Sequence, residues 1–118
     1  MSYIDGFVLA VPAANKQAYL DHATKALPIL QECGITRLVE CWGDDVPHGK
    51  VTDFYRSVQA NEDETVVFSY IEWPDKATRD AGMARAMEEM PESMKEMPFD
   101  GKRMIYGGFQ PIVDDREA

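Results

Sequence analysis

Two strand-like segments of this 118-residue chain, residues 3–11 and 65–73, are largely apolar at both sets of alternating positions. The alternating sets are Phe7, Leu9 and Val11 against Ile4, Val8 and Ala10 in the first segment, and Val67, Ile71 and Trp73 against Phe68 and Tyr70 in the second. Side chains of a strand alternate between the two faces of a sheet. A sheet built from these strands must therefore be covered on both faces.

The other elements follow from periodicity and stop signals. Residues 14–33 carry apolar side chains at helical spacing and end at Gly34, and residues 76–90 follow Asp75, a suitable helix cap. Residues 35–42 and 104–109 have the composition of strands. Residues 51–61 fit a helical turn and a strand equally well, so their structure stays open.

The expected order of strand, helix, strand, strand, helix, strand predicts an α+β, ferredoxin-like domain: one antiparallel sheet with helices on one face. We expect a single domain over residues 1–113 and a polar tail over residues 114–118. Two helices cover only one face, so we expect the same sheet of a second copy to cover the other, as a homodimer. The alternative is a monomer that exposes an apolar face.

The charge and the cysteines limit the compartment and the partners. Twelve basic and 21 acidic residues give a net charge of -9, which repels a nucleic-acid backbone. No apolar stretch is long enough to cross a membrane. Cys33 and Cys41 form no CxxC motif, and we interpret both as packing residues in a reducing compartment. We therefore expect an acidic cytoplasmic protein without membrane or nucleic-acid partners.

Four blocks of sequence resemble the bacterial YbaA-like family. They are residues 3–8, residues 43–47 with 52–54, residues 71–74 and, most specifically, residues 97–109. The family has no established function, and the resemblance implies a dimeric α/β barrel, in which two ferredoxin-like sheets close into one barrel. Proteins of that fold include cofactor-free monooxygenases, muconolactone isomerases, haem-degrading enzymes and small-ligand sensors. Some YbaA-like proteins are linked to the RNA of the signal recognition particle, which the acidic charge disfavours here.

Polar residues within strands are the candidate site residues, because burying a polar group costs free energy unless it is hydrogen-bonded. If several face the barrel interior, a carboxylate could act as a base while Tyr106 or Arg103 steadies an anion. The catalytic candidates are Asp5, Glu72, Arg103, Tyr106 and His22, and the ligand-binding candidates are Glu40, Trp42, Ser69 and Trp73. The favoured alternative is a structural ion-pair network, with Arg103 paired to Glu72 or Asp5.

Other chemistry-bearing patterns are weak. His22 falls on the apolar side of the first helix. It could project into a pocket as a general base or serve as a core residue. Asp44, Asp45 and His48 are weak metal candidates, since a site needs several convergent ligands, and we predict no metal. Methionines recur at positions 83, 87, 90, 94 and 97. This stripe could pack in the core, form a dimer contact or act as a lid over a cavity. No nucleotide-binding or zinc motif occurs, so we predict no cofactor.

Three functions are compatible with these patterns. The first is a small-molecule binder or a cofactor-independent enzyme, monooxygenase-like or isomerase-like, that uses a cavity in a dimeric barrel. The second is a non-enzymatic binding or structural homodimer. The least favoured is association with the RNA of the signal recognition particle.

Overall fold

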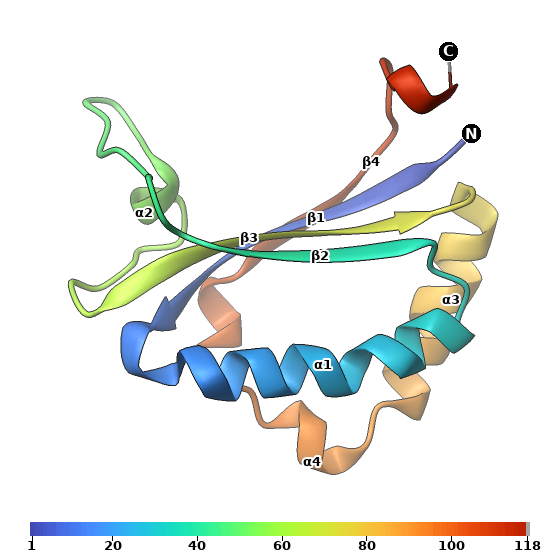
Figure 1. The fold of residues 1–118 in the computed structure, drawn as a ribbon, viewed down its shortest axis with the longest axis horizontal. Helices are drawn as coiled ribbons and strands as arrows, with labels where there is room; N and C mark the ends of the chain where they lie inside the picture. Colours follow the sequence, from blue (N-terminus) through green and yellow to red (C-terminus); the bar gives the residue numbers. More distant parts are fainter. Residues whose placement is uncertain (118) are drawn as a thin grey trace.

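The structure is a computed structural model that describes residues 1–117, and it confirms the ferredoxin-like α+β fold. Four antiparallel strands lie in the order β2-β3-β1-β4 (Figure 1). Their bounds are β1 Tyr3–Pro12, β2 Arg37–Trp42, β3 Glu64–Trp73 and β4 Ile105–Phe109. The two strands that are apolar on both sides, β1 and β3, pair along their whole length at the centre of the sheet.

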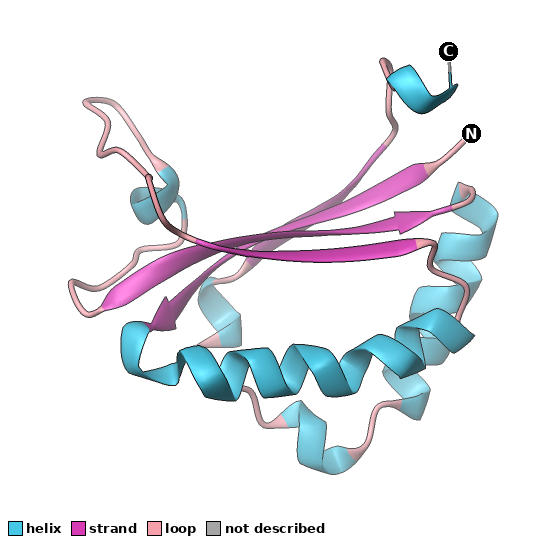
Figure 2. Ribbon diagram, in the orientation of Figure 1, coloured by secondary structure: helices cyan, strands magenta, loops and turns pink. Residues whose placement is uncertain are grey.

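Most helical segments lie on one face of this sheet. Figure 2 shows α1, α3 and α4 below the strands, whereas α2 lies on the other side. The bounds are α1 Lys16–Glu32, α2 Phe54–Ser57, α3 Lys76–Glu89 and α4 Glu92–Lys95, with 3-10 turns at Ala13–Asn15, Gly101–Arg103 and Asp115–Glu117. In the described residues, no helix is long and apolar enough to cross a bilayer.

The core lies between the sheet and the helices. One cluster joins the end of α1 to β3 and α3 through Leu30, Cys33, Ile71, Trp73 and Ala86. Trp73 is fully buried, and Gly82 of α3 faces its ring with no room for a Cβ atom. The glycine therefore allows α3 to approach the sheet closely.

The second face of the sheet is partly covered by residues 51–61 of the chain itself, the segment whose structure the sequence left open. Asp53 caps α2 by accepting a hydrogen bond from the backbone N–H of Arg56 at 2.7 Å, and Gln59 leaves the turn with a positive φ of 51°. Val58 then packs on Ala10 and Val66. Residues 51–61 thus form one helical turn that covers one end of this face.

The rest of the second face remains apolar and accessible. Phe68 of β3 and Ile105 and Phe109 of β4 are large apolar side chains exposed to solvent, with Phe109 61% exposed. The strand register places these three side chains on the face away from α1, together with Ile4 and Val8. The prediction of an apolar second face is therefore confirmed over β1, β3 and β4, although α2 shortens it.

Several local predictions need correction. Arg103, named above among the polar residues within strands, lies in a 3-10 turn before β4, because Asp100 caps that turn. Cys33 is buried as predicted, but Cys41 is exposed, so its interpretation as a packing residue is wrong. The predicted tail, residues 114–118, contains a 3-10 turn whose Arg116 contacts Glu72; Ala118 lies outside the described residues.

Candidate functional site

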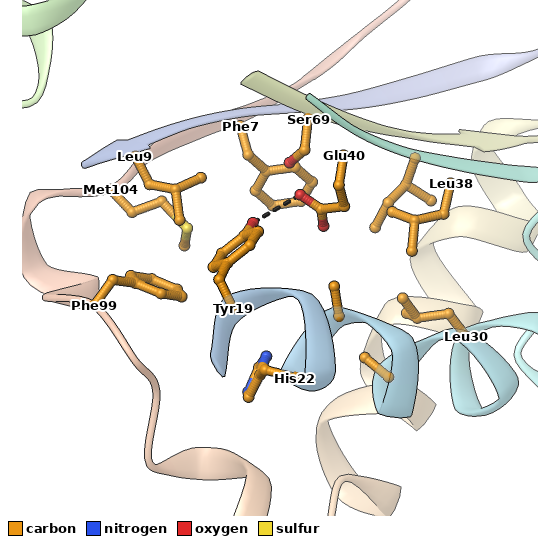
Figure 3. Close-up of a pocket in the computed structure, with 13 residues that line it drawn as sticks. Phe7, Leu9, Tyr19, His22, Leu30, Leu38, Glu40, Ser69, Phe99 and Met104 are labelled. Atoms are coloured by element: carbon orange, nitrogen blue, oxygen red, sulfur yellow. Dashed lines mark hydrogen bonds between the residues drawn. The ribbon is translucent and has the colours of Figure 1, made fainter. Parts of the chain in front are cut away.

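A hollow of about 140 Å³ lies between α1 and the sheet (Figure 3). Its walls are almost entirely apolar. They include Phe7 and Leu9 of β1, Leu30 of α1, Leu38 of β2 and Ile71 of β3. Phe99 and Met104, from the segment between α4 and β4, close one end.

A second hollow of about 230 Å³ opens beside β2. It is lined by Lys16 and Leu20 of α1 and by Trp42 of β2. Both hollows share Tyr19, Ala23 and Glu40. The Tyr19 and Glu40 side chains therefore stand where the two hollows meet, and we call this pair of hollows the Glu40 pocket.

Tyr19 and Glu40 form the polar centre of the Glu40 pocket. Figure 3 shows the two side chains pointing toward each other from α1 and β2. The Tyr19 hydroxyl donates a hydrogen bond to Glu40 Oε1 at 2.7 Å. Ser69 is directly opposite Glu40 in the β2–β3 register, so its buried hydroxyl lies on the same face of the sheet. Three polar groups thus converge within apolar walls.

The apolar walls alter the acidity of both groups. Desolvation raises the pKa of Glu40 above its usual value, although hydrogen bonds from Tyr19 and Ser69 act in the opposite direction. Burial and the neighbouring Glu40 carboxylate also raise the pKa of Tyr19. Water reaches Glu40 through the hollows, so the residue is accessible although its carboxyl lies among apolar walls.

His22 lines the same hollow but is tied to the protein backbone. Its Nε2 lies 2.8 Å from the carbonyl oxygen of Met94 in α4. Because a carbonyl oxygen only accepts, Nε2 must carry a proton, which leaves Nδ1 as the basic nitrogen of a neutral ring. The bond holds α4 against α1, so His22 joins the wall of the pocket to the segment beneath it.

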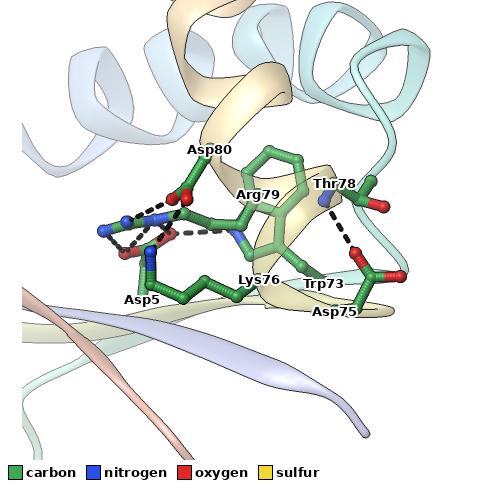
Figure 4. A network of polar contacts seen from close by, with 7 residues as sticks. All are labelled: Asp5, Trp73, Asp75, Lys76, Thr78, Arg79 and Asp80. Atoms are coloured by element: carbon green, nitrogen blue, oxygen red, sulfur yellow. Dashed lines mark hydrogen bonds and ion pairs between the residues drawn. The ribbon is translucent and has the colours of Figure 1, made fainter.

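Asp5 and Trp73, two other candidates, belong to a buried network between α3 and the sheet (Figure 4). The Asp5 carboxylate accepts a hydrogen bond from Trp73 Nε1 at 2.9 Å and from Arg79 Nη2 at 2.8 Å. Asp5 is 3% exposed, and its hydrogen bonds raise the pKa of Arg79. This network joins β1, β3 and α3. It is the kind of ion pair that the structural alternative predicted, but with Arg79 rather than Arg103 as the partner.

The remaining catalytic candidates lie apart from the Glu40 pocket. Arg103 forms a two-bonded ion pair with Glu64, both bonds at 2.8 Å, and also contacts Asp100, so its predicted pairing with Glu72 or Asp5 is wrong. Glu72 is buried on the opposite face beside Arg116. Tyr106 stacks on Phe7 at the β4 edge and is 74% exposed.

The loop that holds Asp44, Asp45 and His48 does not form a cation cage. Across the residues that the structure describes, no group of three or more His, Cys, Asp or Glu side chains is placed to hold a metal ion. The His48 ring stacks on Tyr55 with 4.3 Å between centroids, and the Asp53 carboxylate accepts from the backbone N–H of Gly49. These contacts fix the loop beside α2.

Comparison with known proteins decides the family. Residues 2–101 match the family model DUF1428, which is described as "Protein of unknown function". The chain belongs to the DUF1428 family. It is 56% identical over 117 residues to the uncharacterised protein YbaA of Escherichia coli, covering 98% of this chain and 100% of that protein. YbaA of Shigella flexneri matches to the same extent. The resemblance to YbaA-like proteins is therefore confirmed.

Solved structures show the same fold at low sequence identity. A dimeric ferredoxin-like protein from an uncultured marine organism superposes with a TM-score of 0.62 at 9% identity, covering 96% of this chain and 97% of that one. A protein of unknown function from Nitrosomonas europaea gives a TM-score of 0.52 at 15% identity, covering 97% and 93%. These likenesses support the architecture of this DUF1428 member and do not specify a reaction.

The structure adds residues to the site that the sequence did not single out. Tyr19 falls on the apolar stripe of its helix, where a tyrosine is indistinguishable from a core residue, and Lys16 lies one turn before it. Phe99 and Met104 reach the pocket from more than 75 residues farther along the chain. The only signal for Tyr19 was a hydroxyl on a stripe of otherwise apolar side chains.

We expect Asp5→Ala to lower the free energy of unfolding by about 3 kcal/mol, measured by urea denaturation. The substitution leaves the Arg79 guanidinium without its buried carboxylate and the Trp73 N–H without its acceptor. Glu89→Gln breaks an exposed, solvent-screened ion pair with Arg85 and is the matched control, with a much smaller expected loss. Equal losses in the two variants would contradict a structural role for Asp5.

Glu40→Gln should change how stability depends on pH. Because folding raises the pKa of Glu40 above its ordinary value of 4.5, the folded chain binds this proton more tightly than the unfolded chain. Ionisation of Glu40 therefore lowers the stability of the native protein as pH rises from 4.5 through the folded-state pKa. Glu40→Gln lacks this titration, so its stability relative to the native protein should increase over that range. Urea denaturation at several pH values measures the difference, and a pH-independent difference would be inconsistent with a raised pKa.

Proposed function

We propose that the protein binds a small, mostly apolar molecule in the Glu40 pocket, with a hydrogen-bond donor of the ligand placed at Glu40. The observation that supports this most directly is the Tyr19–Glu40 hydrogen bond inside walls that are mostly apolar. Binding sites for small molecules typically combine such walls with a few convergent polar groups.

The size of the pocket limits the ligand. An apolar cavity of about 150 Å³ accommodates benzene, so the 140 Å³ hollow suits a single ring or a short branched chain. The hollow beside β2 adds about 230 Å³ for a substituent. A ligand of one ring with one or two short substituents fits both.

The hydrogen bonds already made define what the ligand must supply. The Tyr19 proton is donated to Glu40, so the free lone pairs of the Tyr19 oxygen and of the carboxylate can only accept. A ligand that meets this pair must therefore bring an O–H or N–H group. Phenols and alcohols satisfy this requirement, whereas a pure hydrocarbon or an ether does not.

A second function, proton transfer, is supported by the acidity of Glu40. A carboxyl whose pKa is raised by desolvation is a stronger base when ionised than one in water. Placed against an acidic C–H group of the ligand, the ionised Glu40 carboxylate, oriented by the Tyr19 hydroxyl, would accept the proton and leave the electron pair on the ligand. It would then return the proton to another carbon of the ligand. This assigns the base of an isomerase-like reaction to Glu40, in place of Asp5 and Glu72.

A second copy of the chain is part of the proposal. The ferredoxin-like proteins from uncultured marine organisms that share the fold are described as dimeric. In this chain, Phe68 and Phe109 expose apolar rings on the sheet face away from α1. A homodimer that pairs these faces would bury them and leave the Glu40 pocket, on the opposite face, accessible.

Titration with p-cresol, a single ring with one hydroxyl, tests ligand binding. We expect amide NMR shifts at Tyr19, Ala23, Glu40 and Ser69. Ala23→Leu should abolish them, because its side chain would occupy both hollows. Ala84→Leu on the exposed surface of α3 is the control and should leave binding unchanged. The proposal fails if p-cresol causes no saturable shifts, or if Ala23→Leu binds as the native protein does.

Light scattering coupled to size exclusion tests the pairing of sheet faces. We expect the native chain to elute as a dimer at micromolar concentration and Phe68→Glu to elute as a monomer, since a charge would be buried in the interface. Met87→Glu, a similar change on the helical side at a residue 74% exposed, is the control and should remain dimeric. A monomeric native chain would contradict the homodimer without affecting the Glu40 pocket.

A further inference from the structure

Lys16 places a positive charge at the opening of the Glu40 pocket. It lines the hollow beside β2 together with Glu40 and Trp42. Its Nζ lies 5.5 Å from the centroid of the Trp42 ring, a distance at which a cation is attracted to the aromatic face. The ammonium group is therefore held over the wall of the hollow while the residue stays exposed.

This lysine is not neutralised by the protein. Among the described side chains, Lys16 forms no ion pair with a carboxylate. The same holds for Lys25, Lys50, Lys102 and Arg37, but Lys16 is the member of this group that lines the Glu40 pocket. A cation without a partner beside an apolar pocket is available to an anionic group of a ligand.

The spacing along α1 sets the distance between the two polar ends of the site. Lys16, Tyr19 and Ala23 lie on one side of the helix, at intervals of three and four residues. Tyr19 is about 4.5 Å farther along the helix axis than Lys16, and Ala23 about 10 Å. A ligand that reaches both positions therefore needs polar groups separated by roughly one helical turn, and a single ring substituted at opposite ends has that form.

We propose that the ligand of the Glu40 pocket is a small monocarboxylate: a single ring that carries a hydroxyl group at one end, donated to Glu40, and a carboxylate at the other, paired with Lys16. This inference rests on the proposed function, because it assigns the second substituent of the same ligand. It concerns binding only, and no bond of the ligand is broken.

Calorimetric titration of the full chain with three matched ligands tests the assignment. The probes are 4-hydroxyphenylacetate, p-cresol and tyramine, which share the hydroxyl-bearing ring and differ in carrying an anion, no charge and a cation. We expect 4-hydroxyphenylacetate to bind about fivefold more tightly than p-cresol, and tyramine to bind more weakly than both. If only the net negative charge of the protein mattered, it would attract the cation and repel the anion, so tyramine would bind most tightly and 4-hydroxyphenylacetate most weakly.

Variants of α1 separate the effect of the Lys16 ammonium group on ligand binding from the effect of the protein's overall charge. Lys16→Met keeps an apolar side chain over Trp42 but removes the charge, so it should abolish the advantage of the carboxylate and leave p-cresol affinity unchanged. Lys16→Arg should retain the advantage. Lys25→Met removes an exposed charge of the same helix outside the pocket and is the matched control, with no expected effect.

The outcomes distinguish the two proposals. If p-cresol binds in the pocket but the carboxylate gives no advantage, or if Lys25→Met acts as Lys16→Met does, the monocarboxylate assignment is wrong while the proposed function stands. If none of the three probes binds, both are wrong. Unchanged p-cresol affinity in Lys16→Met also shows that the variant is folded.

Discussion

A sheet that is apolar on both faces is the constraint on which the rest of the structure depends. Because β1 and β3 pair at its centre, every other element is arranged to cover one of their faces. α1 and α3 cover one face, and the turn at α2 covers only an end of the other. Burial of apolar surface is the dominant favourable contribution to folding. A second copy would therefore add most stability by burying the uncovered area around Phe68 and Phe109.

The layer between the helices and the sheet must also accommodate polar groups, and it does so in two different ways. Asp5 is fully compensated, since Arg79 and Trp73 donate to its carboxylate. Glu40 is only partly compensated, by Tyr19 and Ser69, and remains next to empty volume. A satisfied buried carboxylate holds a fold together, whereas a partly satisfied one beside a hollow is suited to a ligand or a proton. This difference separates the structural candidate from the functional one.

Sequence reasoning identified the elements more reliably than the site. β1 and β3 follow from their apolar segments and the start of α3 follows from the Asp75 cap, which are local signals. The turn at α2 was ambiguous because four helical residues carry too little periodicity to differ from a strand. Partners such as Arg79 for Asp5 were missed since an ion pair depends on distance in space, and 74 positions separate these two residues in the chain.

The sequence by itself determined the ferredoxin-like order of elements and an apolar surface on each side of the sheet, because strand alternation and helix caps act over a few neighbouring residues. Only the tertiary structure decided that Tyr19 meets Glu40 and that Phe99 closes the hollow beside them. Candidate polar residues of similar type were thereby divided between ion pairs and a pocket. The physical reason is that a carboxylate acquires its properties from neighbours that the fold, rather than the chain order, brings within a few ångströms.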